Sequence, residues 1–198
     1  VTPSIGVAMF PAHGHTPAEL VKHADTAMYH AKSLGRAGWG FFEPAMAEAA
    51  MAELALESRL ARAVREQEFE LHFQPQLALT DGALRGVEAL LRWRHPEHGA
   101  IGPDGFLRIA EARRLILPIG DWVLHEALRW AARWHHAGLL DVPVAVNLST
   151  LQFQAAHFVE GVEQALRDAG ASGAMLELEL TERMLMEDIG GVRVALLR

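Results

Sequence analysis

The sequence predicts an α/β protein in which a small N-terminal α+β module is followed by a connecting helix and a larger parallel-sheet module. Beyond residue 67, strand-like and helix-like segments alternate along the chain, which is typical of a parallel sheet with crossover helices. Residues 44–66 are rich in Ala, Met, Leu and Glu and carry apolar residues at helical spacing, so they predict one helix. The predicted modules are residues 1–43, 44–66 and 67–198.

The N-terminal module is predicted to combine a strand over residues 1–8 with a helix. Thr16-Pro17-Ala18-Glu19 offers an N-cap, a proline at the first helical position and a capping-box glutamate, and Gly35 supplies the stop. In the connecting helix, an apolar stripe that includes Leu54, Leu56 and Leu60 is expected to be packed.

The larger module is predicted to open with a β-hairpin. Residues 69–74 alternate as a strand until Pro75 ends it, and Asp81-Gly82 marks the turn before a second strand over residues 86–93. The following helices and strands are predicted over residues 106–114, 121–137 with Gly138 as stop, 142–149, 155–169 with Gly170 as stop, and 176–182. The tryptophans fall at core-like spacings and are predicted to pack in the core: Trp93, Trp122, Trp130 and Trp134.

Three predicted strands each carry a polar oxygen ligand. Alternation places Glu88, Leu90 and Arg92 on one face of their strand. Asn147 and Glu179 lie near the C-terminal ends of two later strands. An apolar strand that gives one face to an acid and a base either lies at an edge in water or lines a site.

Each of these residues also has a purely structural interpretation. Glu88 taken alone is a solvated glutamate or an ion pair with Arg92. Asn147 followed by Ser149 is equally consistent with a turn and a helix cap. Glu177, on the same face as Glu179, is interpreted as a structural residue.

Five segments, in order and spacing, resemble a known family. They are Gln74-Pro75, the Glu88-Ala89-Leu90-Leu91-Arg92-Trp93 string, Pro103-Asp104-Gly105-Phe106, Asn147-Leu148-Ser149 and Glu179-Leu180-Thr181-Glu182. Together they resemble the EAL-domain phosphodiesterases of bacterial cyclic di-GMP signalling. The resemblance implies a (β/α)8 TIM-like barrel that hydrolyses cyclic di-GMP to linear pGpG.

The resemblance also implies site residues. Glu88, Asn147 and Glu179 would bind Mg²⁺ or Mn²⁺ as catalytic metal ligands, and oxygen donors suit these hard cations. Arg92 would contact a phosphate, for which a planar fork of donors is well suited. The nucleotide pocket would be shaped by Leu90, Gln74 and the segment from Pro103 to Phe106.

Residues 1–43 resemble the C-terminal end of a GGDEF diguanylate cyclase domain. The resemblance rests on residues 1–8, on Ala24-Asp25-Thr26-Ala27-Met28-Tyr29-His30-Ala31-Lys32 and on Gly35-Arg36. It implies that Lys32 and Arg36 contact substrate phosphates, and that GTP binds where a parent protein has an intact GGDEF half. Ala37 stands where the family usually has asparagine, and the metal-binding GGDEF loop does not occur in this chain.

Length is consistent with a different fold or with a truncated barrel, and the resemblance favours truncation. A (β/α)8 barrel takes about 250 residues, and residues 67–198 supply roughly half of that. The family's later aspartate pair, lysine and further glutamate are not in this chain, so the chain alone is expected to be inactive as a hydrolase. The parent protein is expected to be a tandem GGDEF-EAL protein that forms a homodimer. Two alternatives stay open: a receptor that binds cyclic di-GMP without cleaving it, and an interaction module built on the connecting helix.

Composition excludes several classes of function. The chain has no cysteine, which rules out disulfides and thiolate metal sites. A formal charge of −7 argues against binding a nucleic acid polymer, because such proteins are usually basic. No apolar run reaches the ~18 to 20 residues of a spanning helix, and no signal peptide opens the chain. A cytoplasmic location is therefore expected. Segments that precede these residues in a parent protein could still tether it to a membrane.

Overall fold

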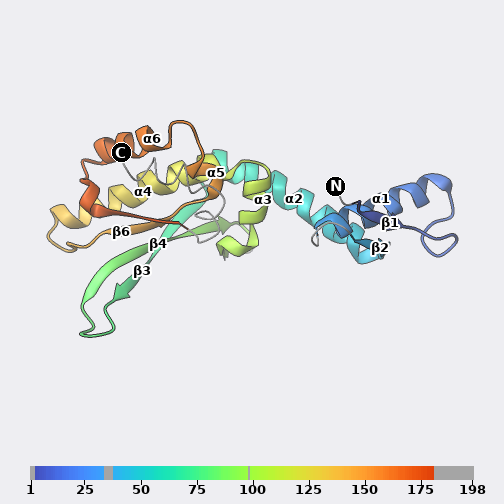
Figure 1. The fold of residues 1–198 in the computed structure, drawn as a ribbon, viewed down its shortest axis with the longest axis horizontal. Helices are drawn as coiled ribbons and strands as arrows, with labels where there is room; N and C mark the ends of the chain where they lie inside the picture. The colour runs from blue at the N-terminus through green and yellow to red at the C-terminus, as the bar shows by residue number, and fades with distance from the viewer. Residues whose placement is uncertain (1–2, 34–37, 98, 181–198) are drawn as a thin grey trace. The chain divides into compact units, whose positions relative to one another are not determined.

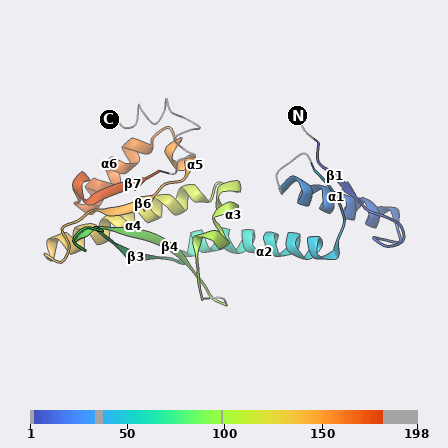
Figure 2. The same ribbon diagram turned by 60° about the horizontal axis from the view of Figure 1, so that its bottom comes forward.

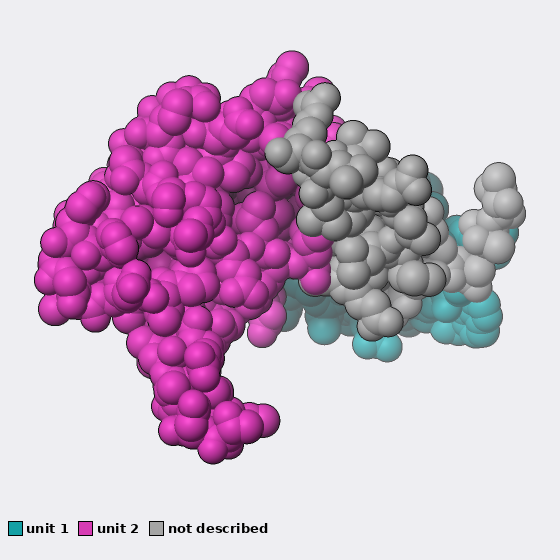
Figure 3. Space-filling model, turned by 60° about the vertical axis from the view of Figure 1, so that its left-hand side comes forward, with its two compact units in different colours: residues 1–59 teal, residues 60–198 magenta. Residues whose placement is uncertain are grey.

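A computed structural model describes residues 3–33, 38–97 and 99–180, which form two compact units, Val1–Arg59 and Leu60–Arg198 (Figure 3). In the first unit, β1 (Ile5–Val7) pairs in parallel with β2 (Trp39–Phe41), and α1 (Pro17–Ser33) packs on both strands. A Cβ atom at Gly6 would lie 1.9 Å from the carbonyl oxygen of Ala24. Glycine at this position therefore lets α1 lie directly on β1.

The predicted start of α1 is confirmed. The backbone N–H of Glu19 donates to the Thr16 hydroxyl at 3.2 Å, and the Glu19 carboxylate accepts from the N–H of Thr16 at 3.1 Å. This reciprocal pair is a capping box. The carboxylate also accepts from the N–H of His15 at 2.8 Å. The predicted stop at Gly35 lies outside the described residues.

The helix predicted over residues 44–66 is confirmed as α2 (Pro44–Glu66). Its apolar stripe is packed only in part. Leu60 and Ala63 are fully buried, whereas Leu54 is 62% exposed. The expectation that the whole stripe packs is therefore wrong for Leu54.

The second unit opens with the predicted hairpin. β3 (Phe69–Leu77) pairs antiparallel with β4 (Leu84–His95), and Gly82 in the turn has φ of +69°. The prediction that Pro75 ends the first strand is wrong, because Pro75 pairs with Val87 inside the ladder. Proline, which lacks an N–H, is tolerated here because β3 is the outer strand of the sheet that the described residues form.

The remaining strands extend this sheet. β6 (Val144–Asn147) lies parallel to β4, and β7 (Leu176–Glu179) lies parallel to β6, giving the strand order β3-β4-β6-β7 (Figure 1). A short strand that the sequence did not predict, β5 (Gly99–Ile101), pairs antiparallel with the far end of β4. The described strands form an open sheet, which fits the expectation of an incomplete barrel.

The three predicted helices are present with shifted bounds, and the structure adds a short helix over Thr150–Phe153 that the sequence did not predict. They are α3 (Leu107–Ala112), α4 (Ile116–His136), α5 (Thr150–Phe153) and α6 (Phe158–Ala169), with 3₁₀ turns η1 (Pro103–Gly105) and η2 (Gly173–Met175). The start predicted for α4 at Asp121 is wrong, because Pro118 falls in the first helical turn, where a missing N–H costs no hydrogen bond. The stop at Gly170 is confirmed by its left-handed backbone, with φ of +61°.

One face of the sheet is apolar and covered by helices. The main buried residues of this core are Val87, Ala89, Trp93, Val144 and Val146 from the strands and Ile119, Leu124 and Leu128 from α4. Helices α4 and α6 pack on each other and run alongside β6 and β7 (Figure 2). Trp93 is fully buried, as predicted. None of the helices in the described ranges is long and apolar enough to cross a lipid bilayer.

Candidate functional site

The other face of the sheet carries the polar side chains. In the antiparallel ladder Gln74 is the register partner of Glu88, and Gln76 is the partner of Gly86. Side chains alternate along a strand, so Leu90 and Arg92 share this face with Glu88. In the parallel ladders Glu88 aligns with Ala145, and Asn147 aligns with Glu179. The face opposite the helix-covered core therefore gathers carboxylates and amides.

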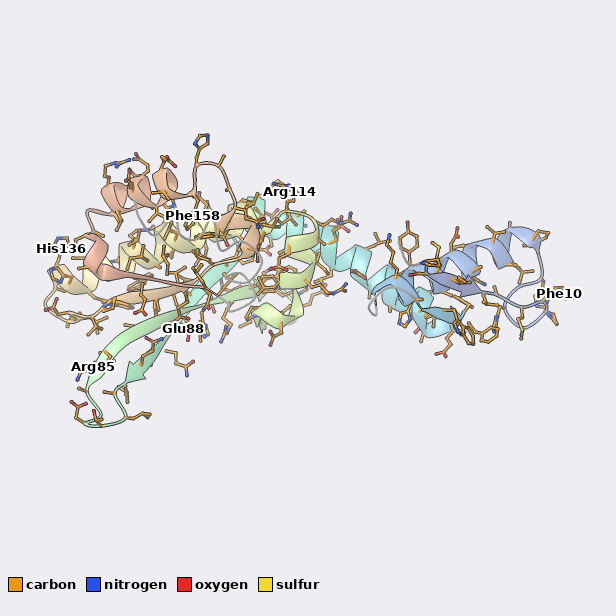
Figure 4. The ribbon with its side chains drawn as sticks, viewed as in Figure 1. Phe10, Arg85, Glu88, Arg114, His136 and Phe158 are labelled. Carbon is orange, nitrogen blue, oxygen red and sulfur yellow. The ribbon has the colours of Figure 1, made fainter. Side chains whose placement is uncertain are left out.

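Glu88 and Asn147 contact each other directly. Glu88 lies on β4 (Figure 4), and its Oε1 accepts a hydrogen bond of 2.7 Å from Nδ2 of Asn147, the last residue of β6. The two residues are 59 positions apart in the sequence, so the parallel pairing of β4 and β6 is what joins them.

Glu179 is the third member of this group. It is the last residue of β7 and the register partner of Asn147. Its backbone carbonyl accepts from the N–H of Leu148 at 3.0 Å, which extends the ladder past Asn147. Its carboxylate oxygen Oε1 accepts from Nε2 of Gln76 on β3 at 3.2 Å. The three predicted metal ligands thus lie on neighbouring strands, at or near the ends of the parallel pairing.

The turn after Asn147 has its own structural role. Ser149 is the N-cap of α5, and its hydroxyl accepts from the N–H of Gln152 at 3.3 Å. The side-chain oxygen of Gln152 in turn accepts from the N–H and the hydroxyl of Ser149, at 3.2 and 2.8 Å. The helix-cap interpretation is therefore correct for Ser149, while the Asn147 side chain reaches Glu88.

A cavity of about 280 Å³ adjoins this cluster. Asn147, Ser149 and Gln152 form its polar side, and Leu90 and Pro103, both predicted pocket residues, line it together with apolar residues of α3 and α4. One wall is therefore shared with the polar cluster, and the rest is apolar apart from Glu111 of α3, as expected for a small-ligand pocket.

Two other predicted site residues are placed differently. Phe106 is only 1% exposed and packs edge-on against Trp93 at 5.7 Å, so it supports the site from the core. The guanidinium of Arg92 donates to the carbonyl oxygen of Leu91 at 2.8 Å, and the structure records no ion pair between Arg92 and Glu88. Local pairing of Glu88 with Arg92, the structural alternative, is therefore not what holds Glu88.

The remaining predicted site residues are Gln74, Lys32 and Arg36. Gln74 is exposed beside Glu88. Lys32 is exposed in the last turn of α1, in the other unit. Arg36, Thr181 and Glu182 lie outside the described residues. The sequence reasoning did not single out Gln76 and Gln152, although the two-residue spacing of Gln76 from Gln74 places both on the same strand face.

The donor set suits a hard divalent cation in part. Glu88, Asn147 and Glu179 offer two carboxylates and an amide oxygen, which are ligands that Mg²⁺ and Mn²⁺ accept. Nδ2 of Asn147 is the atom that faces Glu88, so the amide would have to turn to present its oxygen. Across the described ranges, no group of three or more His, Cys, Asp or Glu side chains comes together. These residues fit part of a coordination shell.

Comparison with known protein families identifies the family to which this chain belongs. The EAL domain matches residues 57–198, and the end of the diguanylate cyclase GGDEF domain matches residues 1–38. The chain therefore belongs to the EAL-domain family of cyclic di-GMP phosphodiesterases, with the end of a GGDEF domain before it.

Two curated relatives are similar to nearly the whole of this chain. The chain is 45% identical over 188 residues to the bifunctional diguanylate cyclase/cyclic di-GMP phosphodiesterase MucR of Pseudomonas aeruginosa, covering 95% of this chain and 27% of MucR. It is 42% identical over 189 residues to the cyclic di-GMP phosphodiesterase NbdA of the same organism, covering 96% of this chain and 24% of NbdA. The chain thus spans about a quarter of the length of these relatives.

Solved structures show the same fold. The MucR phosphodiesterase in complex with cyclic di-GMP superposes with a TM-score of 0.69 at 43% identity, covering 72% of this chain and 58% of that one. The EAL enzyme Bd1971, bound to cAMP and cyclic di-GMP, gives a TM-score of 0.70 at 25% identity, covering 94% of this chain and 50% of that one. The described strands and helices therefore have the EAL-type α/β arrangement.

Proposed function

We propose that this chain supplies part of the catalytic face of a cyclic di-GMP phosphodiesterase. The observation that carries the proposal is the meeting of Glu88, Asn147 and Glu179 on neighbouring parallel strands, beside a cavity. Support for the substrate comes from the relatives, since MucR and NbdA are named as cyclic di-GMP phosphodiesterases. The modules we propose are a GGDEF end over residues 1–43, a connecting helix over 44–66 and an EAL part over 67–198.

The proposed ligands of Mg²⁺ or Mn²⁺ are Glu88, Asn147 and Glu179. When bound, such a cation lowers the pKa of a coordinated water and neutralises charge on the phosphoryl oxygens. In the reaction, water adds to phosphorus and the bond from phosphorus to the 3′ oxygen breaks, which opens the cyclic dinucleotide to the linear one.

The chain's other residues would hold the substrate. Leu90 and Pro103 on the cavity wall would contact a nucleobase, for which an apolar surface is suitable. Arg92 would leave its backbone acceptor to pair with a phosphate, because a guanidinium binds phosphate with two parallel hydrogen bonds. Gln74, exposed beside Glu88, would add a hydrogen-bond donor.

Turnover of cyclic di-GMP tests this proposal at two lengths of chain. The 198 residues alone are expected to give no linear product, because the described residues bring together no ligands beyond Glu88, Asn147 and Glu179. The same protein in its full natural length is expected to hydrolyse cyclic di-GMP with Mg²⁺ or Mn²⁺, and Glu88→Ala should abolish that activity. If the 198 residues alone hydrolyse cyclic di-GMP, and Glu88→Ala abolishes that turnover, the ligands in this chain are already sufficient for catalysis.

A second outcome would indicate a receptor. If the full-length protein binds cyclic di-GMP without cleaving it, and the affinity does not depend on Mg²⁺ or Mn²⁺, the site holds the dinucleotide through Arg92 and the cavity alone. Binding is best followed by calorimetry, with product formation followed by chromatography on the same samples.

A further inference from the structure

Gln76 joins the outermost strand of the sheet to the end of β7. Its Nε2 donates to Oε1 of Glu179 at 3.2 Å, between residues 103 positions apart in the sequence. β3 and β7 are not neighbours, because β4 and β6 lie between them. The hydrogen bond therefore spans two strands across the polar face.

Small residues on the two intervening strands make this contact possible. The register partner of Gln76 on β4 is Gly86, and a Cβ atom there would lie 2.6 Å from Oε1 of Gln76. On β6 this face carries Ala145, the fully buried register partner of Glu88, and Asn147 at the end of the strand. Gly86 thus leaves the space in which the Gln76 side chain crosses β4.

This arrangement leaves Glu179 oriented by a neutral donor. Among the described residues, Gln76 holds one carboxylate oxygen of Glu179 and no hydrogen bond is made to the other, which could bind a further ligand. A carboxylate that binds a cation is commonly hydrogen-bonded by a second residue that fixes its direction, and loss of that residue weakens metal affinity by about 10- to 100-fold.

We propose that Gln76 is a positioning residue that orients Glu179 as a ligand of a divalent cation, and that Gly86 is required for Gln76 to reach it. This inference rests on the proposed function, because it requires that Glu179 bind Mg²⁺ or Mn²⁺. It adds a residue that binds neither cation nor substrate.

Mn²⁺ binding to the full-length protein, measured by calorimetry and by electron paramagnetic resonance, tests the inference. Gln76→Met keeps the length of the side chain and removes the donor, so it should weaken Mn²⁺ binding by about 10- to 100-fold. Gln164→Met is the matched control, because Gln164 donates to Asp168 on the surface of α6, away from the site. That control should bind Mn²⁺ as the unaltered protein does.

Gly86→Ala provides an independent variant. The added methyl group would collide with the Gln76 amide, so Gly86→Ala should weaken Mn²⁺ binding in the unaltered protein. In a protein that already carries Gln76→Ala, Gly86→Ala should have little further effect on Mn²⁺ binding, because the shorter side chain at position 76 leaves room for the added methyl group. This non-additive result decides the question even if Gln76→Met does not fold.

The outcomes separate this inference from the proposed function. If Mn²⁺ binds, Glu179→Ala removes it, and both Gln76→Met and Gly86→Ala bind Mn²⁺ normally, Gln76 does not position Glu179 and the inference is wrong. If the unaltered protein binds no Mn²⁺, or if Glu88→Ala and Glu179→Ala leave Mn²⁺ binding unchanged, the proposed metal site itself is wrong, and the inference falls with it.

Discussion

The side-chain amide of Asn147 donates a hydrogen bond of 2.7 Å to Oε1 of Glu88, and this bond connects the neighbouring parallel strands β6 and β4. Each side chain limits the directions that the other can take. Without a cation, the amide nitrogen satisfies the carboxylate. With a cation, an oxygen of Asn147 would be needed at the same place. The pair is therefore arranged so that cation binding would replace one interaction with another.

The first prediction concerns the charge at position 147. Asn147→Asp replaces a donor by a second carboxylate against Glu88, so the variant should lose about 1 kcal/mol of stability without a cation. With Mn²⁺ the added anionic ligand should strengthen binding. Melting temperatures of the full-length protein in EDTA and in Mn²⁺ measure both effects, and the Mn²⁺-induced rise should exceed that of the unaltered protein.

A matched control for this variant is Gln154→Glu, which adds the same charge at an exposed residue just after α5. It should change neither melting temperature by a comparable amount. An Asn147→Asp variant that melts like the unaltered protein in EDTA would mean that the contact with Glu88 does not form in solution.

The second prediction concerns the contact between α4 and the turn after β6. Gly120 is buried on α4, and a Cβ atom there would lie 1.8 Å from Nε2 of Gln152. Gly120→Ala should displace Gln152, disrupt its capping box with Ser149, and lower stability by about 1–3 kcal/mol through overpacking. Urea unfolding curves of the variant and the unaltered protein provide the measurement.

Gly161→Ala on α6 is the control, because nothing lies within 4 Å of its Cβ position. Replacement of an unhindered helical glycine by alanine is expected to raise stability by up to about 1 kcal/mol. If both variants shift the urea midpoint in the same direction, the close packing of Gln152 on Gly120 is not present in solution.

Much of the fold could be predicted because its signals are local. The capping residues Thr16 and Glu19, the Asp81-Gly82 turn and the stop at Gly170 act within a few residues, and each is confirmed. The errors arise where tertiary context decides. Pro75 stays in its strand because β3 is the outer strand of the described sheet, which the sequence of that segment alone does not reveal.

The candidate site was predictable as a set of residues but not as a set of contacts. Alternation indicated the faces of Glu88 and Glu179. It could not show that Asn147 binds Glu88 or that Gln76 reaches Glu179, because both contacts depend on strand order and register. The expectation that Leu54 would be packed was wrong for a similar reason. Helical spacing shows which residues of α2 share a face, but it does not show which turns of that face another element covers.

The third prediction compares two leucines of α2. Leu60 is fully buried and Leu54 is 62% exposed. Leu60→Ala should leave a cavity and cost about 2–5 kcal/mol, whereas Leu54→Ala should change stability by no more than about 0.5 kcal/mol. Urea unfolding of both variants tests the difference, and equal losses would indicate that Leu54 is covered in the protein in solution.

The last prediction concerns pH and the start of α1. Hydrogen bonds from the backbone N–H groups of His15 and Thr16 hold the pKa of the Glu19 carboxyl below its ordinary value of 4.5. Because the folded-state pKa is the lower one, the contribution of Glu19 to stability is present above pH 4.5 and is lost as the pH falls through the folded pKa. Glu19→Gln keeps an acceptor oxygen but cannot titrate, so it should remove this part of the acid dependence. An NMR titration of the Glu19 carboxyl carbon should give a midpoint below 4.5, with the N–H signals of His15 and Thr16 shifting over the same range. A midpoint at or above 4.5 would mean that the capping box does not form in solution.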